Sequence, residues 1–482
     1  MMGIYQPQPQ LFSYQVNLEK RIRADHPLRR IAQAVDFSFV RAEVAAVYGH
    51  NGNESVDPAI LLKMMFLLFY DNVASERELM NVIPERLDYL WFLGYGLDDE
   101  IPHHSVLSKA RRRWGKEVFE RLFIRTVEQC VAAGLVSGDK LHVDASLIAA
   151  NASKDSVVKS SPELIAAYAA AYAAQEKKLN DPADRPCFQA VNDVAISTTD
   201  PDAGLVRKGG QGAHPAYHHH RAVDDGYGVI TAVETTSGSI AENKKLGALM
   251  EQHKQNTDCQ LKTVVADYKY GTAENFVACH RQGVVTHLGD AQDKRGKVEG
   301  IFGPERFEYQ SASDTYVCPA GQRLRRRRYI RRQRVWEYGA DKAVCAGCAL
   351  RTQCTRSKVA RVVSRHEAAE VLKICRQQAH SAAARQDRRR RQYLIEGSFA
   401  DAANNHGFKR ARWRRLWRQQ IQDYLIAAIQ NIRILLARAV LKPAAGAALV
   451  LEKAIRLKLG WCLSLRSAPS IYHVRKQSCG ER

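Results

Sequence analysis

Three carboxylates occupy positions from which they could act together on one substrate. Asp144 lies inside the short apolar run KLHVDAS, Asp267 directly follows the run LKTVVA, and Glu396 lies in the segment YLIEGSFADA. Three acids that converge on one point repel one another unless cations lie between them, and hard oxygen ligands suit Mg²⁺ or Mn²⁺. Two such ions, about 3.5–4 Å apart, support in-line displacement at phosphorus. The three residues therefore predict a two-metal site for phosphodiester chemistry.

Each acid also has an explanation that involves no chemistry. A carboxylate at a strand end would account for Asp267, and one on a helix surface would account for Glu396. Asp144 is harder to explain in this way, because an aspartate inside a buried strand must be paired or bound to a metal. Asp224 and Asp225 are rivals for the second ligand, but the glycine-containing turn that holds them accounts for both.

The elements around these acids follow a recognisable order. The patterns predict a strand at 140–146, a hairpin of 217–223 and 229–235, a helix at 242–254, a strand at 261–266, a helix at 272–281 and a strand at 284–288. A helix that resumes near 383 then carries Glu396. This is the order of a ribonuclease-H-like fold, in which the first strand is central and the fourth lies beside it. We therefore expect a mixed α/β sheet with flanking helices, in which Asp144 and Asp267 emerge at one edge and the Glu396 helix packs across.

The first 135 residues carry the signals of successive short helices. Asp57-Pro58 places an N-cap before a proline at the first helical position, and Ser75 opens a capping box. Further helices are predicted at 105–114 and along the apolar positions of 118–131. Near the other end, apolar residues at spacings of three and four between 416 and 436 predict a helix that faces the core.

Four of the eleven cysteines cluster between the last predicted strand and the Glu396 helix. Cys345 and Cys348 have the CxxC spacing of a zinc half-site, and Cys318 and Cys354 could complete a tetrahedral Cys₄ site. Buried or incidental cysteines are the alternative, since only one pair has the tight spacing. A small segment with little apolar content would need such a staple. An odd number of cysteines over a long chain also predicts a reducing compartment, and hence the cytoplasm.

The chain is strongly basic. Its 72 Lys+Arg against 51 Asp+Glu give a net charge of +21 and a pI near 9.5, which favours nucleic acid as the partner over a ribosome-associated or membrane-surface role. Basic residues form a block at 323–334 and flank Glu396, where they would neutralise phosphates. Such runs also form solvated helix faces. The candidate DNA contacts are Lys109, Arg111, Arg112, Arg113, Lys409, Arg410, Arg412, Arg414 and Arg415.

The sequence predicts neither a membrane span nor a secretory signal. The longest apolar stretch, 60–70, has 11 residues and contains Lys63, whereas a span needs about 20. The N-terminus MMGIYQPQPQ lacks the basic and apolar regions of a signal peptide.

Three motifs together resemble the DDE transposases of bacterial insertion sequences, in the group with an InsH-like helical N-terminal domain. They are HVDASLIAANAS (142–153), VVADYKYGTAENF (264–276) and YLIEGSFADAANNHGFKRARWRR (393–415), and HHSVLSKARRRWG (103–115) also fits. The resemblance runs from about 56 to 436. It implies a ribonuclease-H-like catalytic domain with a cysteine-rich insertion. It also implies a catalytic triad of Asp144, Asp267 and Glu396 that holds two Mg²⁺ or Mn²⁺ ions.

Two segments depart from this resemblance. The tail after Leu441 matches nothing in the family. The run His218–His220, before the hairpin turn, could bind a stray metal, although polar strand residues explain it better.

The resemblance also implies an activity and a partner. Enzymes of this family cleave double-stranded DNA at the terminal inverted repeats of their element and join the ends to target DNA, which predicts a homodimer in the synaptic complex, at the nucleoid. Two alternatives stay open, a ribonuclease-H-like nuclease without strand transfer and a catalytically silent DNA-binding regulator. We accordingly divide the chain into a helical N-terminal DNA-binding domain, a first core segment, the insertion, a second core segment and a basic tail of unknown role: 1–135, 136–289, 290–382, 383–440 and 441–482.

Overall fold

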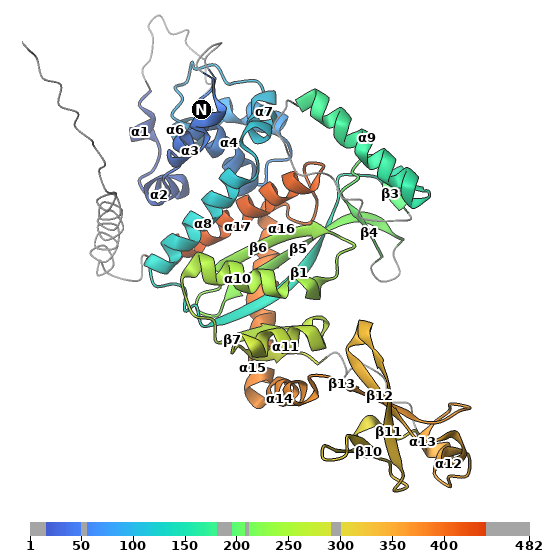
Figure 1. The fold of residues 1–482 in the computed structure, drawn as a ribbon. Helices are drawn as coiled ribbons and strands as arrows, with labels where there is room; N and C mark the ends of the chain where they lie inside the picture. Colours follow the sequence, from blue (N-terminus) through green and yellow to red (C-terminus); the bar gives the residue numbers. More distant parts are fainter. Residues whose placement is uncertain (1–15, 50–54, 181–194, 208–211, 291–299, 440–482) are drawn as a thin grey trace, which may run out of the picture.

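The computed structural model describes residues 16–49, 55–180, 195–207, 212–290 and 300–439 (Figure 1). The predicted basic tail, 441–482, lies outside the described residues, as do the first fifteen. Figure 1 shows a body of helices around a sheet, with a second, smaller sheet at one end.

The N-terminal part is helical, as predicted. Asp57 caps a helix by accepting a hydrogen bond from the backbone of Ala59 at 2.8 Å, with Pro58 at the first helical position, and Ser75 caps the next helix through Glu78 N. The elements are α1 (Leu18–Arg21), α2 (Pro27–Ala34), α3 (Phe39–Val44), η1 (Ala45–Val47), α4 (Pro58–Tyr70), α5 (Glu76–Val82), η2 (Ile83–Glu85), α6 (Leu87–Leu93), α7 (Ser105–Trp114) and α8 (Glu117–Ala132).

A six-stranded mixed sheet forms the centre. Its strands are β1 (Lys140–Ala149), β4 (Gly204–Val206), β5 (His214–Asp224), β6 (Ile230–Ser237), β7 (Thr263–Ala266) and β8 (Val285–Leu288). β1 lies between β5, which is antiparallel to it, and β7, which is parallel to it. β6 and β4 pair with the far side of β5, and β8 pairs parallel to β7. The order across the sheet is therefore β6-β5-β1-β7-β8, and the short β4 pairs with the first residues of β5, beyond the stretch that pairs with β6. Strands β1, β6, β7 and β8 all run towards the same edge.

Helices cover both faces of this sheet. On one face Val143 and Val264 pack against α10 (Leu246–Thr257), α11 (Ala273–Arg281) and α14 (Ala369–His380). On the other face Tyr217 and Val233 share one core with the N-terminal helices, α16 (Gly397–His406) and α17 (Leu416–Ala439). Since successive strand residues point to opposite faces, Asp144 points to the α16–α17 face. The buried stripe on α17, including Ile421, Leu425, Ile429 and Ile432, confirms the predicted core-facing helix.

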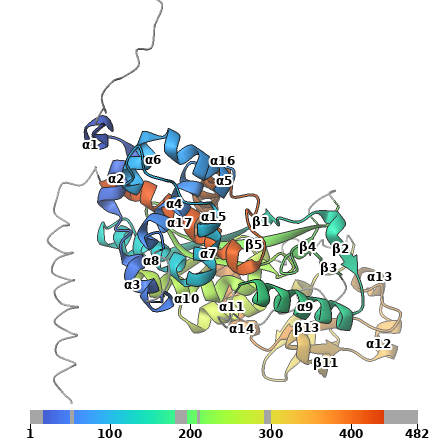
Figure 2. The same cartoon turned by 90° about the horizontal axis from the view of Figure 1, so that it is seen from above.

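A peripheral segment follows β1. The sequence predicts an exposed helical excursion at 155–190, and the structure has η3 (Lys154–Ser156), then α9 (Pro162–Asn180) beside a two-stranded sheet of β2 (Val157–Lys159) and β3 (Ala195–Ser197). Figure 2 shows α9 alongside β2 and β3 at the rim of the molecule.

The cysteine-bearing segment folds as a second sheet, which the sequence patterns do not predict. Five antiparallel strands run in the order β13-β12-β11-β10-β9 around a small core of Phe307, Leu324, Tyr338, Ala340 and Val363. The elements are η6 (Pro304–Arg306), β9 (Glu308–Gln310), β10 (Thr315–Val317), β11 (Arg323–Ile330), η7 (Arg331–Gln333), β12 (Val335–Gly339), α12 (Lys342–Ala346), α13 (Arg351–Cys354) and β13 (Val362–His366). Most of the predicted arginine block is thus strand β11.

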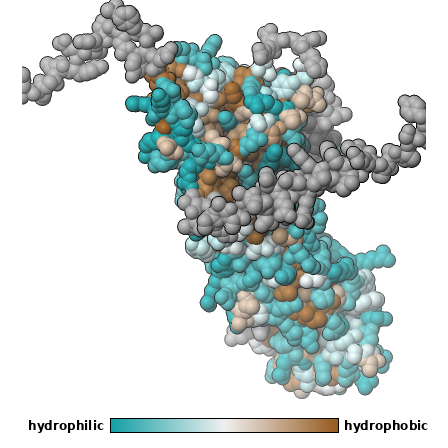
Figure 3. Space-filling view, turned by 90° about the vertical axis from the view of Figure 1, so that its left-hand side faces the viewer, coloured by the Kyte–Doolittle hydropathy of each residue, from teal (hydrophilic) through white to brown (hydrophobic). Residues whose placement is uncertain are grey.

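Within the described ranges no helix has the length and apolar character needed to cross a membrane. Figure 3 shows hydrophilic residues over most of one side of the molecule, with hydrophobic patches between them.

Candidate active site

The sheet brings Asp144 and Asp267 to the same level. The parallel register pairs His142 with Val265, so Asp144 and Asp267 each lie two residues beyond that pair on adjacent strands. Neighbouring strands are about 4.8 Å apart, and residues in register point to the same face. Burial raises the pKa of Asp267, and the negative charge of Asp144 raises it further. The predicted first two carboxylates therefore lie close enough to repel each other.

Asp144 already has a cationic partner. Nη1 of Arg391, the last residue of α15 (Ala382–Arg391), donates to its Oδ2 at 2.6 Å, and only 21% of the Asp144 side chain is exposed. Burial raises the pKa of Asp144, while the Arg391 guanidinium lowers it. Here Arg391 supplies the positive charge that a buried strand aspartate requires.

Glu396 lies at the end of a π turn on the helix that crosses the sheet. This turn, η8 (Gln392–Glu396), joins α15 to α16 and packs against β1. A π turn closes its hydrogen bonds between residues five apart, so it brings Arg391 and Glu396 towards one face, whereas an α-helix would set them about 140° apart. Glu396 is exposed and makes no hydrogen bond or ion pair with any residue that the structure describes. The structure therefore places it on the helix next to β1, without a contact to either aspartate.

Sequence reasoning missed a further carboxylate at this centre, Glu242. It begins η4 (Glu242–Lys245), which follows β6, and its negative charge raises the pKa of both Asp144 and Asp267. Lys269 Nζ donates to its Oε1 at 2.8 Å. The only sequence signal was an acid shortly after the second strand of the hairpin, and β6 ends at the same sheet edge as β1 and β7.

A tyrosine hydroxyl is buried among these acids. Tyr270, at the end of η5 (Tyr268–Tyr270), is fully buried, and its Oη has no hydrogen-bond partner in the described structure. Burial raises its pKa well above the ordinary value, and the charges of Asp144, Glu242 and Asp267 raise it further. An unpaired buried hydroxyl is costly, and such an atom beside acids marks a place where a ligand or water would bind.

Arg221 holds the crossing helix in place. It lies opposite Asp144 in the β1–β5 register and is fully buried. Its Nη1 donates to Ser398 Oγ at 2.6 Å and to Gln430 Oε1 at 2.9 Å, and so ties β5 to α16 and α17. Burial lowers the pKa of Arg221 to about 10, which still leaves it charged at neutral pH. Ser398 is two residues from Glu396, so Arg221 positions the helix that carries this acid.

The residues at this edge fit a hard divalent cation. Carboxylate oxygens and a partnerless hydroxyl form an oxygen-only donor set, the kind that Mg²⁺ and Mn²⁺ prefer. Within the described ranges, however, no three His, Cys, Asp or Glu side chains stand in a ready-made arrangement for a metal ion. Instead, the guanidinium of Arg391 donates a hydrogen bond to Asp144, and the ammonium of Lys269 donates one to Glu242. Cation binding there would therefore have to compete with two basic side chains.

Comparison with known proteins gives two family matches. A family model described as a transposase domain (DUF772) matches residues 16–113. A second model, described as a transposase DDE domain, matches residues 317–436, which include Glu396 and the four clustered cysteines. Both matches support a DDE transposase of an insertion sequence. No curated protein matches it. The second model does not extend over Asp144 or Asp267, so the positions of these two residues in the structure are separate support for their assignment.

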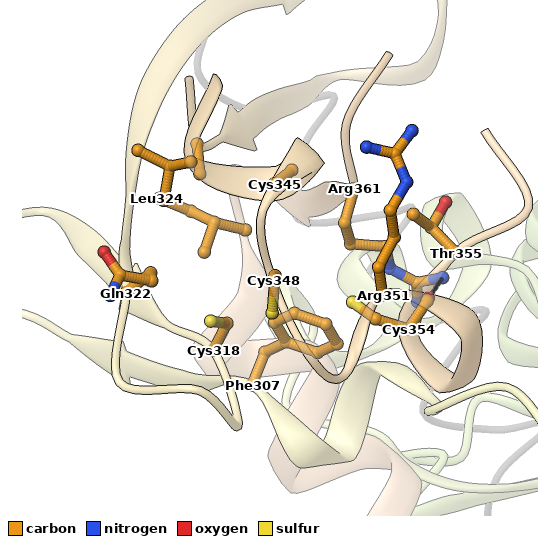
Figure 4. Close-up of a pocket in the computed structure, with 12 residues that line it drawn as sticks. Phe307, Cys318, Gln322, Leu324, Cys345, Cys348, Arg351, Cys354, Thr355 and Arg361 are labelled. Carbon is orange, nitrogen blue, oxygen red and sulfur yellow. Dashed lines mark hydrogen bonds between the residues drawn. The ribbon is translucent and has the colours of Figure 1, made fainter. Parts of the chain in front are cut away.

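The clustered cysteines of the transposase surround one cavity in the second sheet. Cys318, Cys345, Cys348 and Cys354 line a space of about 30 Å³ with Phe307 (Figure 4). None of the four forms a disulfide. Burial raises the pKa of the Cys354 thiol, and the other three cysteines raise it further, although Arg361 lowers it. Cys318 also begins a tight turn, in which Gly321 N donates to its carbonyl at 2.8 Å.

The histidine run is part of β5, as its explanation by strand residues predicts. His219 is fully buried and pairs with Asp423 of α17 at 3.0 Å, and His220 contacts Thr236 Oγ1 at 2.9 Å. These histidines join β5 to its neighbours.

Several basic residues predicted to contact DNA instead make contacts with other residues of the transposase. Arg111 is 3% exposed, pairs with Glu76 and stacks on Trp413. Arg415 is buried and pairs with Asp202 at 2.9 Å. Arg412 binds Val73 O and Asn72. We leave these three out of the proposed DNA contacts, because their charges are already paired or buried. Arg112 is half-buried, whereas the exposed members of the predicted set are Lys109, Arg113, Lys409, Arg410 and Arg414.

The exposed basic residues beyond Glu396 follow the outer half of β1. Ala149 N donates to Lys409 O at 3.0 Å, and Lys409 Nζ reaches Ser146 Oγ at 2.7 Å. Farther along, Arg414 Nε donates to Asn151 O at 3.3 Å. A cleft of about 720 Å³ opens at this end, lined among others by Asn72, Arg77, His104, Asn151, Arg410 and Trp413. The basic track begins two residues from Asp144 and ends at this cleft.

Proposed function

We propose that this transposase cleaves DNA at the ends of an insertion sequence and joins the freed 3′ ends to target DNA. Asp144, Asp267 and Glu396 would hold two Mg²⁺ or Mn²⁺ ions on a ribonuclease-H-like domain. The observation that carries the proposal is the juxtaposition of Asp144 and Asp267 at one sheet edge, beneath the helix that bears Glu396. The strand order β6-β5-β1-β7-β8 supports the fold assignment.

The roles of the side chains follow from this geometry. Divalent ions bound by the three acids would activate the attacking oxygen and stabilise the leaving oxygen. Arg391 holds Asp144 in place before cations bind and opposes the rise in its pKa that burial causes, and it is then available to a phosphate oxygen of the DNA. Arg221 fixes the helix so that Glu396 stays beside β1.

A strand-transfer assay tests this function against its alternatives. DNA flanking the coding region supplies the substrate, because inverted repeats there mark the element ends. With Mg²⁺, a duplex of one end should be cleaved, and its 3′ end should become joined to a supercoiled plasmid. Cleavage without joining would identify a nuclease, and binding of the ends without either product would identify a regulator. A plasmid incubated with a duplex of shuffled sequence is the matched control.

The same proposal includes an assembly and a location. Two element ends must be handled together, so we propose a homodimer in the synaptic complex. The DNA substrate would place the protein at the nucleoid in the cytoplasm.

We propose that DNA enters along the basic track formed by Lys409, Arg410 and Arg414. The track begins next to Asp144 and leads to the polar cleft between α5, α7 and the segment before α17. Exposed lysines and arginines bind phosphates and release counterions, which makes affinity depend on salt. The exposed Lys109 and Arg113 of α7 are further proposed contacts, and Arg112, which is half-buried, joins them.

The salt dependence of DNA binding should show whether DNA phosphates contact this basic track. Replacing Arg410 and Arg414 together by alanine should reduce the slope of log affinity against log salt by about 2, since each lost phosphate contact removes about 0.9. Fluorescence anisotropy with an end duplex at several salt concentrations measures the slope. Arg281→Ala is the control, because this exposed arginine ends α11, four residues before the start of β8, and so lies towards the opposite sheet edge. An equal change in the control and the double variant would reject the track.

We also propose that the four clustered cysteines bind one structural Zn²⁺. The support is their position around a single cavity and the absence of disulfides among them. A Cys₄ set suits tetrahedral zinc with Zn–S distances of about 2.3 Å.

A further inference from the structure

We propose that Glu242 is a fourth carboxylate of the catalytic centre and contributes an oxygen to the divalent cations held by Asp144 and Asp267. This inference rests on the proposed function, because it needs those two aspartates to bind cations. It adds a ligand that the DDE pattern does not contain.

The position of Glu242 follows from the sheet. β6 is antiparallel to β5, which is antiparallel to β1, so β6 and β1 run in the same direction. Glu242 comes five residues after the end of β6, and Asp267 comes one residue after the end of β7. Both residues therefore lie where parallel strands end, at the edge that Asp144 approaches, and the adjacent turns η4 and η5 pack together.

The contacts of Glu242 hold its carboxylate at this edge. Its side chain is only 13% exposed, Lys269 Nζ binds Oε1 at 2.8 Å, and His218 Nε2 lies 3.7 Å from the same oxygen. Lys269 also donates its backbone N–H to Asp267 Oδ1 at 3.0 Å. One residue thus fixes both carboxylates, and the second oxygen of Glu242 makes no hydrogen bond with any described residue.

A separate observation points to a ligand at this place. The Tyr270 hydroxyl is fully buried and has no partner in the described structure, and it lies within the combined field of Asp144, Glu242 and Asp267. Glu396, by contrast, is exposed and makes no hydrogen bond or ion pair with any described residue. Hard cations are bound by several oxygen ligands, and without a ligand the Tyr270 hydroxyl would stay unsatisfied.

Cation binding without DNA tests the proposal directly. Calorimetric titration of the full-length protein with Mn²⁺ should show affinity reduced by at least roughly 10- to 100-fold in Glu242→Gln, because the loss of even a hydrogen-bond partner of a metal ligand typically costs that much. Glu234→Gln is the matched control, because Glu234 also pairs with a lysine, Lys245, at 2.5 Å and is 20% exposed. The control should bind Mn²⁺ like the wild type.

A second variant separates a cation ligand from a structural partner of Lys269. If Glu242 only held Lys269 in place, Lys269→Met should weaken Mn²⁺ binding as much as Glu242→Gln does. If Glu242 binds the cation, Lys269→Met removes a competitor and should leave the affinity unchanged or raise it. Glu242→Asp, which keeps the charge but shortens the side chain, replaces Glu242→Gln if that variant does not fold, and it should also weaken Mn²⁺ binding.

Two further results would overturn the inference, and they differ in what they say of the proposed function. Wild-type Mn²⁺ affinity in Glu242→Gln, with affinity lost in Asp144→Asn, would remove Glu242 and leave the catalytic centre intact. Unchanged affinity in Asp144→Asn, Asp267→Asn and Glu242→Gln alike would overturn the cation centre itself.

Discussion

Asp144→Asn, Asp267→Asn and Glu396→Gln should each lower DNA cleavage by roughly 10³-fold or more. Each change keeps the shape of the side chain and removes one negative charge from the cation site. Charge stabilisation by a bound metal is worth several kcal/mol, and about 1.4 kcal/mol is a factor of ten in rate. Because the three acids act as one unit, a double variant should be hardly slower than a single one. Gel-based cleavage of an end duplex under single-turnover conditions measures the effect.

Binding and folding controls keep this result specific. DNA affinity without divalent cations should persist or increase in each variant, because the centre becomes less negative to an approaching phosphate. Glu370→Gln is a matched control, since Glu370 is exposed and pairs with Arg365 at 2.7 Å in the second sheet. It should cleave like the wild type, and thermal unfolding should confirm that all variants fold.

Of the three assignments to the triad, that of Glu396 is the easiest to contradict by experiment. Its side chain makes no described contact, and its assignment depends on the family motif and on the π turn beside β1. Near-normal cleavage by Glu396→Gln, with both aspartate variants inactive, would remove it from the triad. Glu367 and Glu370 would be poor replacements, because both are paired with arginines in the second sheet. Glu242 would then be the acid to examine.

The sequence predicts the central sheet because each strand is a short apolar run bounded by a turn or a helix signal. Once β1 and β7 are predicted to pair in parallel, Asp144 and Asp267 are expected at the same level on adjacent strands, and the register of the two strands agrees. The starts of two N-terminal helices could be predicted equally well from the sequence. Asp57 and Ser75 cap these helices, and the capping hydrogen bonds join residues at most three positions apart. Such features depend on local sequence, which is why they could be predicted.

The features that were missed depend on partners distant in sequence. Strand β11 was not predicted because its many arginines leave no alternation of apolar and polar residues. Leu324 is the one residue of that strand in the small core. Arg111 looked like a DNA contact, but Glu76 pairs with it inside the protein. The π turn at 392–396 leaves no mark in a helical sequence, and Glu242 lies in a turn that only the sheet brings close to Asp267.

Zinc content and the order of the second sheet should change together. Protein purified without chelator should contain about one zinc per chain, and Cys345→Ser or Cys348→Ser should remove it, because three thiolates and a hydroxyl no longer close a tetrahedral site. The core of this sheet has only five buried residues, too few to hold five strands without a further tie. Loss of the metal should therefore loosen β9–β13, while the central sheet, which has its own cores, keeps its order.

Elemental analysis and hydrogen exchange measure the two effects in the same samples. Amides of β11 and β12 should exchange faster in Cys345→Ser, whereas those of β1 and β5 should not. Cys259→Ser is the control, since Cys259 is a partly exposed, unbridged cysteine outside the cavity. Absence of zinc from the wild-type protein, or zinc retained in full by both cavity variants, would contradict a Cys₄ site. The four cysteines would then be packing residues of the small core, where Cys318, Cys345 and Cys354 already contact its apolar side chains.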